Sequence, residues 1–143
     1  MRSVFSPSVT QYQLNPEELA ALIRAAIQEG HIVSFKAPGN SMIPFIRSGD
    51  KIFVEPVERH SIHVGDVIVF VQVGNGHVLA HRVVQLKSNR MLCKGDNVAN
   101  SFDGWTLFEG VLGRVIKVQR EGKPVHFGLG IGIVFFPHAF LQN

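Results

Sequence analysis

The chain has 143 residues, of which 45% are hydrophobic and 17% are charged, a composition typical of one globular domain with a real core. Its formal net charge of +3 comes from scattered basic residues with no run of four, so we expect no nucleic acid partner. The single cysteine, Cys93, excludes an internal disulfide and fits a reducing compartment.

The N-terminal residues are expected to form an irregular arm over residues 1–14, followed by one amphipathic helix. Asn15 is a suitable helix cap, Pro16 suits the first helical position, and acidic residues fill the first turn. Gly30 is a plausible end of the helix. The apolar side chains at helical spacing are Leu19, Leu22, Ile23 and Ile27. A DNA-binding helix-turn-helix needs at least two helices, so this region does not predict one.

After Gly30 the apolar pattern changes to one typical of β-strands. Gly74-Asn75-Gly76 is a tight-turn sequence and predicts a hairpin. We therefore predict a mainly β fold of coiled, barrel-like sheets behind the helix. We divide the chain into residues 1–30, the arm and helix, and residues 31–143, one β domain. The expected strands are residues 31–35, 51–55, 67–73, 77–86, 91–94, 111–118 and 125–127.

No segment has the features of a signal peptide or of a transmembrane anchor. The N-terminus lacks a long apolar core, and no window reaches the roughly 18 apolar residues that a spanning helix needs. The closest candidate, Phe127 to Phe136, is short and broken by glycines. We interpret it as a buried strand pair, with peripheral membrane contact as the alternative. We expect a protein that is cytoplasmic or peripheral to the membrane.

Two residues forty positions apart could supply a nucleophile and a base. Ser41 lies in the glycine-bearing turn Gly39-Asn40-Ser41-Met42, where its hydroxyl could attack a carbonyl. His81 lies on a predicted strand whose alternation gives it apolar neighbours, a setting that favours a neutral imidazole able to accept the serine proton. Each residue also has a structural interpretation, as a turn serine bonded to its own backbone and as a core histidine bonded to a carbonyl.

Several segments taken together resemble the signal-peptidase and LexA-type serine peptidases, over roughly residues 32 to 118. The similar segments are Gly39-Asn40-Ser41-Met42 with Pro44 and Gly49-Asp50, then Val64-Gly65-Asp66-Val67-Ile68-Val69-Phe70, then His81-Arg82-Val83-Val84, and finally Gly95-Asp96-Asn97 with Asn100-Ser101 and Asp103. Bacterial signal peptidases and LexA-type proteins have lysine as the base. The archaeal, endoplasmic-reticulum and sporulation-type signal peptidases have histidine there, as this chain does. The resemblance implies coiled β-sheets with an SH3-like barrel.

The resemblance also implies roles for individual residues. Ser41 matches the nucleophile, and its backbone N–H would donate to the oxyanion. His81 matches the base, and Asp103 matches the acid that supports the active site and could orient His81. Ser101 matches a hydroxyl that helps to hold the base. Asp96 is expected to fix the Gly-Asp-Asn turn, with the orientation of His81 as the alternative role.

Two further positions belong to the nucleophile motif. Gly39 stands where many signal peptidases have a serine that serves the oxyanion hole, and Met42 directly follows the nucleophile. The implied activity is a serine endopeptidase that needs no cofactor. Its substrate is expected to bind as an extended strand, with small residues near the scissile bond.

Two other functions of the same fold remain open. The first is a LexA-type self-cleaving regulator, although no Ala-Gly or Cys-Gly pair precedes Ser41. The second is a peptide-binding module without turnover. The usual transmembrane anchor of signal peptidases is not seen, so we expect peripheral docking, a partner protein or soluble peptide substrates.

A metal site and a cysteine nucleophile are less favoured interpretations. The pair His60 and His63 would point to opposite faces of a strand, and neither this pair nor His77 and His81 is completed by a third ligand of the zinc type. We therefore expect no metal. Cys93 lies in an apolar strand and is expected to be an inert, buried thiol.

Overall fold

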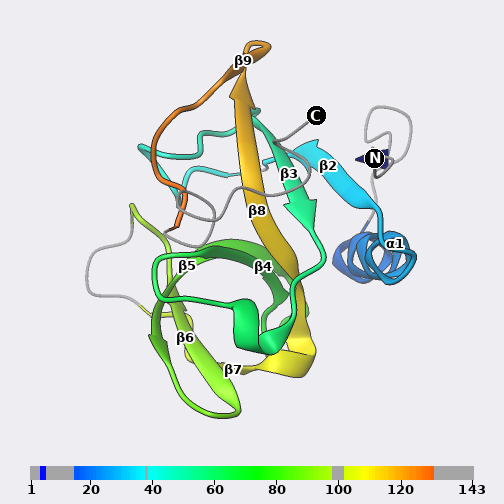
Figure 1. Ribbon diagram of the computed structural model, residues 1–143, viewed down its shortest axis with the longest axis vertical. Helices are drawn as coiled ribbons and strands as arrows, with labels where there is room; N and C mark the ends of the chain where they lie inside the picture. The colour runs from blue at the N-terminus through cyan, green and yellow to red at the C-terminus, as the bar shows by residue number, and fades with distance from the viewer. Residues whose placement is uncertain (1–3, 6–14, 38, 98–101, 131–143) are drawn as a thin grey trace.

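The computed structural model describes residues 4–5, 15–37, 39–97 and 102–130, and these residues form one mixed sheet with a helix packed beside it (Figure 1). The mainly β fold predicted from the sequence is confirmed. The helix is α1 (Pro16–Gln28), and the two 3-10 helices are η1 (Arg59–Ser61) and η2 (Phe108–Gly110). The strands are β1 (Val4–Phe5), β2 (Ile32–Lys36), β3 (Lys51–Glu55), β4 (Val67–Val71), β5 (Val78–Leu86), β6 (Arg90–Lys94), β7 (Trp105–Leu107), β8 (Val111–Arg120) and β9 (Lys123–Pro124).

The helix begins where the sequence predicts. The Asn15 side chain accepts a hydrogen bond from the Glu18 backbone N–H at 2.8 Å, and the Glu18 carboxylate accepts one from the Asn15 N–H, which together form a capping box. Gly30 follows the helix with a φ of +83°, a left-handed conformation that glycine adopts without steric cost. Ile23 and Ala26 are buried, so this face of α1 fixes the helix on the sheet.

The long strand β8 organises the sheet. It pairs antiparallel with β3 on one side and with β4 on the other, and the strand order is β1-β2-β3-β8-β4-β5-β6-β7, with β9 paired to β8. In Figure 1 the strands β4 to β7 curl around the lower end of β8, while β2 lies beside its upper part and α1 lies on the same side at about mid-height. This coiling brings the turn after β2 close to β5, although some forty residues separate them in the chain.

The centre of the sheet is buried on both faces. Along β4, Val67 and Val69 pack into the larger apolar cluster, whereas Ile68 and Phe70 pack into a second one. Successive side chains of a strand point to opposite faces, so β4 divides the two clusters. Burial on both faces explains why β4 reads as a continuous apolar run rather than as an alternating one.

Several expectations about the elements are wrong. Residues 125–127 are not a strand, because β9 ends at Pro124. Residues 105–107 form β7, which the sequence analysis missed, and Val4–Phe5 lies in β1, paired parallel with β2, rather than in an irregular arm. His60 lies in η1, so the opposite-face argument made for this residue does not apply. Ser101 and the segment 131–136 lie outside the described residues, and residues 127–130 are irregular, not part of a strand pair.

Among the described residues, no helix combines the length and apolar character needed to cross a membrane. The same part of the chain contains no group of three His, Cys, Asp or Glu side chains arranged to hold a metal ion. The boundary between residues 1–30 and 31–143, and peripheral membrane contact through residues 127–136, stay predictions.

Candidate active site

The turn between β2 and β3 presents Ser41. The turn is closed by a hydrogen bond from the Ile46 N–H to the Met42 carbonyl at 3.0 Å, and Met42, Phe45 and Ile46 are buried beneath it. The Asn40 side chain accepts a hydrogen bond from the Ser48 N–H at 3.0 Å. These contacts fix the turn on the core, while Ser41 itself stays partly accessible.

His81 projects from β5 toward this turn. Its Nε2 atom lies 2.8 Å from the Ser41 Oγ atom. The residue is only 6% exposed, and its ring meets the Phe70 ring edge-on, with 6.4 Å between the centroids. Leu79 and Val83, two positions away on either side, pack with the second apolar cluster, as the alternation along the strand predicts. The serine hydroxyl is therefore within hydrogen-bonding distance of an imidazole that is largely shielded from water.

Asp103 lies behind the imidazole, at its other nitrogen. The Asp103 Oδ2 atom is 2.5 Å from His81 Nδ1, and the Asp103 N–H is anchored on the Cys93 carbonyl at 3.0 Å. An ionised carboxylate only accepts hydrogen bonds, so Nδ1 must carry the proton. Nε2 is then left as the acceptor for the Ser41 hydroxyl. The three side chains form a continuous hydrogen-bonded series in the order required for serine catalysis.

Asp96 has a different partner. Both of its carboxylate oxygens accept hydrogen bonds from the Arg82 guanidinium, each at 2.8 Å. Of the two acids that the sequence left as alternatives, Asp103 is the one that contacts His81. Asp96 lies in the segment Gly95-Asp96-Asn97, and its N–H contacts the Met42 sulfur at 3.3 Å.

The segment Gly95-Asp96-Asn97 lies directly on the nucleophile turn. The Asn97 N–H donates to the Ser41 carbonyl at 2.8 Å, and the Asn97 side-chain amide donates to the Asn40 carbonyl at 3.2 Å. Sequence reasoning missed these contacts and those of Arg82, because a motif gives the order of residues but not which carbonyl each one meets. Glycine at position 95 was the available signal, since glycine allows two backbones to approach closely.

Cys93 is not a competing nucleophile. The side chain is fully buried, and burial, reinforced by the negative charge of Asp103, raises the pKa of its thiol to about 12. The thiolate is the reactive form of cysteine, so this residue stays unreactive near neutral pH. The expectation of a buried, inert thiol is supported.

A small pocket adjoins the serine and the histidine. Its volume is about 210 Å³, and its wall combines Ser41 and His81 with small and aliphatic side chains. Gly39 also lines it, while Met42, the residue after the nucleophile, forms part of the floor of the turn. The aliphatic part of the wall consists of Ala37, Met42, Ile46, Val78, Leu79 and Ala80.

One edge of β5 is open beside this pocket. Val78 to Ala80 pair with β4, but β6 pairs with β5 only from Arg82 onward. Within the described ranges no other strand occupies the remaining edge at residues 78–80. The backbone groups of this edge are the kind that an added peptide strand binds.

A coiled β-fold that places a serine, a histidine and an aspartate in hydrogen-bonded order defines a protein of the serine-peptidase type. The family model described as Peptidase S24-like matches residues 6–101, more than half of the chain, so this chain belongs to that family. Ser41 and His81 fall inside the matched range, and Asp103 lies just beyond it. The resemblance to the LexA and signal-peptidase group is thereby confirmed. A comparison with curated proteins gave no match.

Proposed function

We propose that this protein is a serine endopeptidase of the signal-peptidase type, in the branch that uses histidine as the base. The observation that carries the proposal is the series Ser41 Oγ, His81 Nε2, His81 Nδ1 and Asp103 Oδ2, joined at 2.8 Å and 2.5 Å. A base must lie within about 3 Å of the hydroxyl that it activates, and this one does. A lysine base has no counterpart to the Nδ1 contact, because the lysine side chain carries only one nitrogen.

The proposed reaction uses the two nitrogens of His81 in different ways. As Ser41 Oγ bonds to the scissile carbonyl carbon, its proton moves to His81 Nε2, and the carbonyl oxygen takes the electron pair of the broken π bond. Collapse of this intermediate breaks the C–N bond, and the proton on Nε2 passes to the leaving amine. Water then repeats the sequence on the acyl group, giving its proton to Nε2, and Ser41 is released with its hydroxyl restored.

Two groups stabilise the charges that form. Asp103 stabilises the imidazolium and holds the ring in the required tautomer. The Ser41 backbone N–H is the donor assigned to the oxyanion, and such a donor typically lowers the activation barrier by about 2.7–4 kcal/mol. Ser101, which lies outside the described residues, is kept as the hydroxyl proposed to support the base.

The substrate is proposed to bind as an extended peptide along the open edge of β5. In that position an alternating side chain of the peptide would enter the 210 Å³ pocket. The pocket holds only about 210 Å³, so small residues are preferred before the scissile bond. The same edge and pocket would also serve a peptide-binding module without turnover, which is the alternative that the experiment must separate.

The proposal is tested with a mixture of unstructured peptides, analysed by mass spectrometry for new termini. Wild type should cut after small residues and should be phosphonylated at Ser41 by an alkyl fluorophosphonate. Ser41→Ala and His81→Ala should remain folded and lose cleavage. Cleavage that survives Ser41→Ala would overturn the proposal. Peptide binding with neither cleavage nor labelling in the wild type would favour the non-catalytic module.

A further inference from the structure

The side chain of Arg82 joins segments that are far apart in the sequence. It follows His81 on β5 and uses four of its five N–H donors. Two of them form a fork on the Asp96 carboxylate, each at 2.8 Å, a geometry that lysine cannot reproduce. Its Nη1 atom donates to the Gly65 carbonyl and to the Gly128 carbonyl, each at 2.7 Å.

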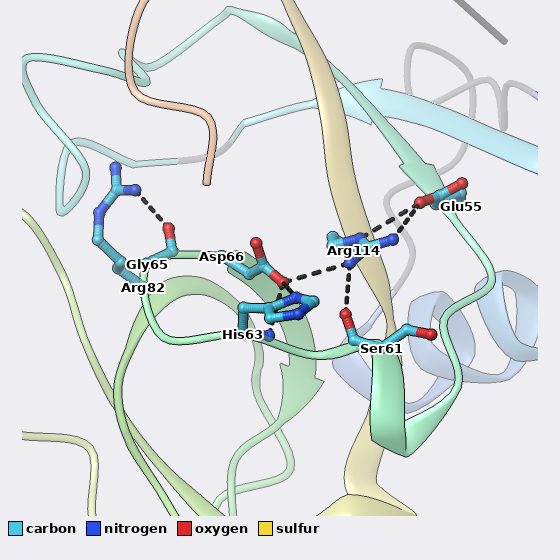
Figure 2. Close-up of polar contacts among 7 residues, drawn as sticks. All are labelled: Glu55, Ser61, His63, Gly65, Asp66, Arg82 and Arg114. Atoms are coloured by element: carbon cyan, nitrogen blue, oxygen red, sulfur yellow. Dashed lines mark hydrogen bonds and ion pairs between the residues drawn. The ribbon is translucent and has the colours of Figure 1, made fainter. Parts of the chain in front are cut away.

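The Gly65 carbonyl belongs to a rigid part of the molecule. The neighbouring Asp66 is fully buried and accepts hydrogen bonds from the His63 N–H at 2.9 Å and from Arg114 at 3.3 Å. Arg114 in turn donates to the Ser61 carbonyl and to Glu55. Figure 2 shows Arg82 reaching Gly65 on one side of this turn and the Arg114 cluster on the other. The turn at residues 63–66 is therefore a fixed anchor for the guanidinium.

A second anchor comes from the segment that follows β9. Gly128 has a φ of +91° and lies against Phe45, where a Cβ atom would be only 2.4 Å from the phenylalanine ring. Arg82 also stacks over the Phe45 ring, with the guanidinium carbon 5.7 Å from the centroid. Phe45 is part of the turn that carries Ser41. The guanidinium thus lies between the nucleophile turn and the Gly128 backbone.

Asp96, which binds the fork of Arg82, connects the anchored guanidinium with the nucleophile. Asp96 lies between Gly95, which packs on Ser41 and His81, and Asn97, whose N–H binds the Ser41 carbonyl at 2.8 Å. Without the fork, Asp96 would keep only weaker restraints, such as its N–H contact to the Met42 sulfur. A displacement of this segment would move the Ser41 carbonyl, and with it the hydroxyl relative to His81.

We infer that Arg82 is a positioning residue, which acts through Asp96 to hold Ser41 in register with His81. The inference rests on the proposed function and extends it from the three reacting side chains to the scaffold behind them. A misplacement of about 1 Å typically costs about 10²-fold in rate, although the chemical groups are all present. Arg82 does not touch the hydroxyl, so its effect should appear in kcat rather than in KM.

The test compares Arg82→Gln, Asp96→Asn and the double variant in peptide cleavage and in the rate of Ser41 phosphonylation, each normalised to folded protein. We expect each single variant to lower kcat and the labelling rate about 10–100-fold, with KM changed less than about twofold. The double variant should be no slower than the slower single variant, because both changes break the same link. Arg82→Lys keeps the charge but not the fork and should recover only part of the rate.

The control is Arg59→Gln. Arg59 forms an ion pair with Glu109 at 3.4 Å and stacks over the Phe108 ring, and these contacts join neither the Ser41 turn nor the segment 95–97. This variant should leave the labelling rate of the folded protein unchanged. Wild-type labelling rates in Arg82→Gln, or losses that multiply in the double variant, would overturn the inference and leave the proposed function intact. If Arg82→Gln does not fold, Asp96→Asn decides alone. A wild type that neither cuts nor labels would overturn the proposed function and the inference together.

Discussion

Gly95 lies so close to Ser41 that a Cβ atom at position 95 would stand 2.6 Å from the Ser41 carbonyl oxygen. The same atom would be 3.3 Å from His81 Nε2. The first distance is below any that real Cβ atoms adopt, and the neighbour is backbone, which cannot swing away as a flexible side chain would. A glycine is therefore required here for close approach, not for an unusual φ.

Gly95→Ala should consequently reduce activity without unfolding the protein. Either the segment 95–97 or the Ser41 turn has to shift, and we expect kcat to fall about 10²-fold. Peptide cleavage and Ser41 labelling measure the effect, and circular dichroism checks the fold. Gly110→Ala is the control, because its Cβ would meet its nearest atoms at an ordinary 3.5 Å. Full activity in Gly95→Ala would contradict this close packing of Gly95 on Ser41.

Asp103→Asn tests the orientation of the imidazole. The amide can present its NH₂ group to Nδ1, which favours the tautomer with the proton on Nε2, where it cannot accept from Ser41. In the serine-protease triad the same change lowers kcat about 10⁴-fold while the geometry persists. We expect a loss of that order, measured with saturating peptide. A loss below about tenfold would mean that His81 does not depend on Asp103.

The roles of nucleophile and base came from the family resemblance, because the local pattern around each residue also allowed a structural interpretation. Ser41 is in a glycine-bearing turn, and the alternation along β5 places His81 among apolar side chains. The sequence does not decide whether Asp96 or Asp103 orients His81, since this depends on which of the two acids the fold brings next to the imidazole. Asp103 reaches His81 because its N–H is bound to the Cys93 carbonyl on β6, a contact that leaves no pattern in the sequence.

The errors in strand prediction have similar causes. β7 has only three residues, too few to show a period, and its pairing to β6 depends on tertiary contacts. Val125 and Phe127 are apolar, but the chain leaves the sheet after one further hydrogen bond, from the Val125 N–H to the Val118 carbonyl at 2.8 Å. Phe127 then packs against Phe45, with 6.0 Å between the ring centroids. The apolar residues predicted a strand here, but Phe127 is 51% exposed and contacts Phe45 outside the sheet.

Ala80→Leu should block the pocket beside Ser41. Ala80 lines a space of about 210 Å³, and a leucine side chain would fill part of it. We expect kcat/KM for peptides to fall at least about tenfold, and the remaining activity to shift toward glycine before the scissile bond. A small fluorophosphonate should still label Ser41. Ala25→Leu, on the exposed side of α1, is the matched control. Unchanged peptide selectivity would show that this pocket does not receive the substrate side chain.

Cys93 should behave as a buried structural thiol. Because burial and the charge of Asp103 raise its pKa to about 12, the native protein should resist iodoacetamide near pH 8 and react once it is unfolded by guanidinium. Intact mass spectrometry at successive times gives both rates. Cys93→Ala should keep peptide cleavage per folded molecule. Rapid alkylation of the native protein at Cys93 would show that this strand opens readily or that the thiol is not buried.

The carboxylate of Asp50 should make the stability of the protein depend on pH in acid. Burial acts to raise the pKa of Asp50, but the Arg120 hydrogen bond, the Arg47 N–H and the nearby positive charges outweigh it, so that the pKa lies below its ordinary value of 3.8. A folded-state pKa below the unfolded value stabilises the protein at pH values above the unfolded pKa. This contribution is lost as the pH falls through the folded-state pKa.

Asp50→Asn should therefore lower the free energy of unfolding by about 1–2 kcal/mol at pH 7. The difference from wild type should shrink as the pH falls below 3.8. Denaturant titrations at neutral and acidic pH measure both values, and a difference that stays constant across this range would mean that the charge of Asp50 does not stabilise the turn.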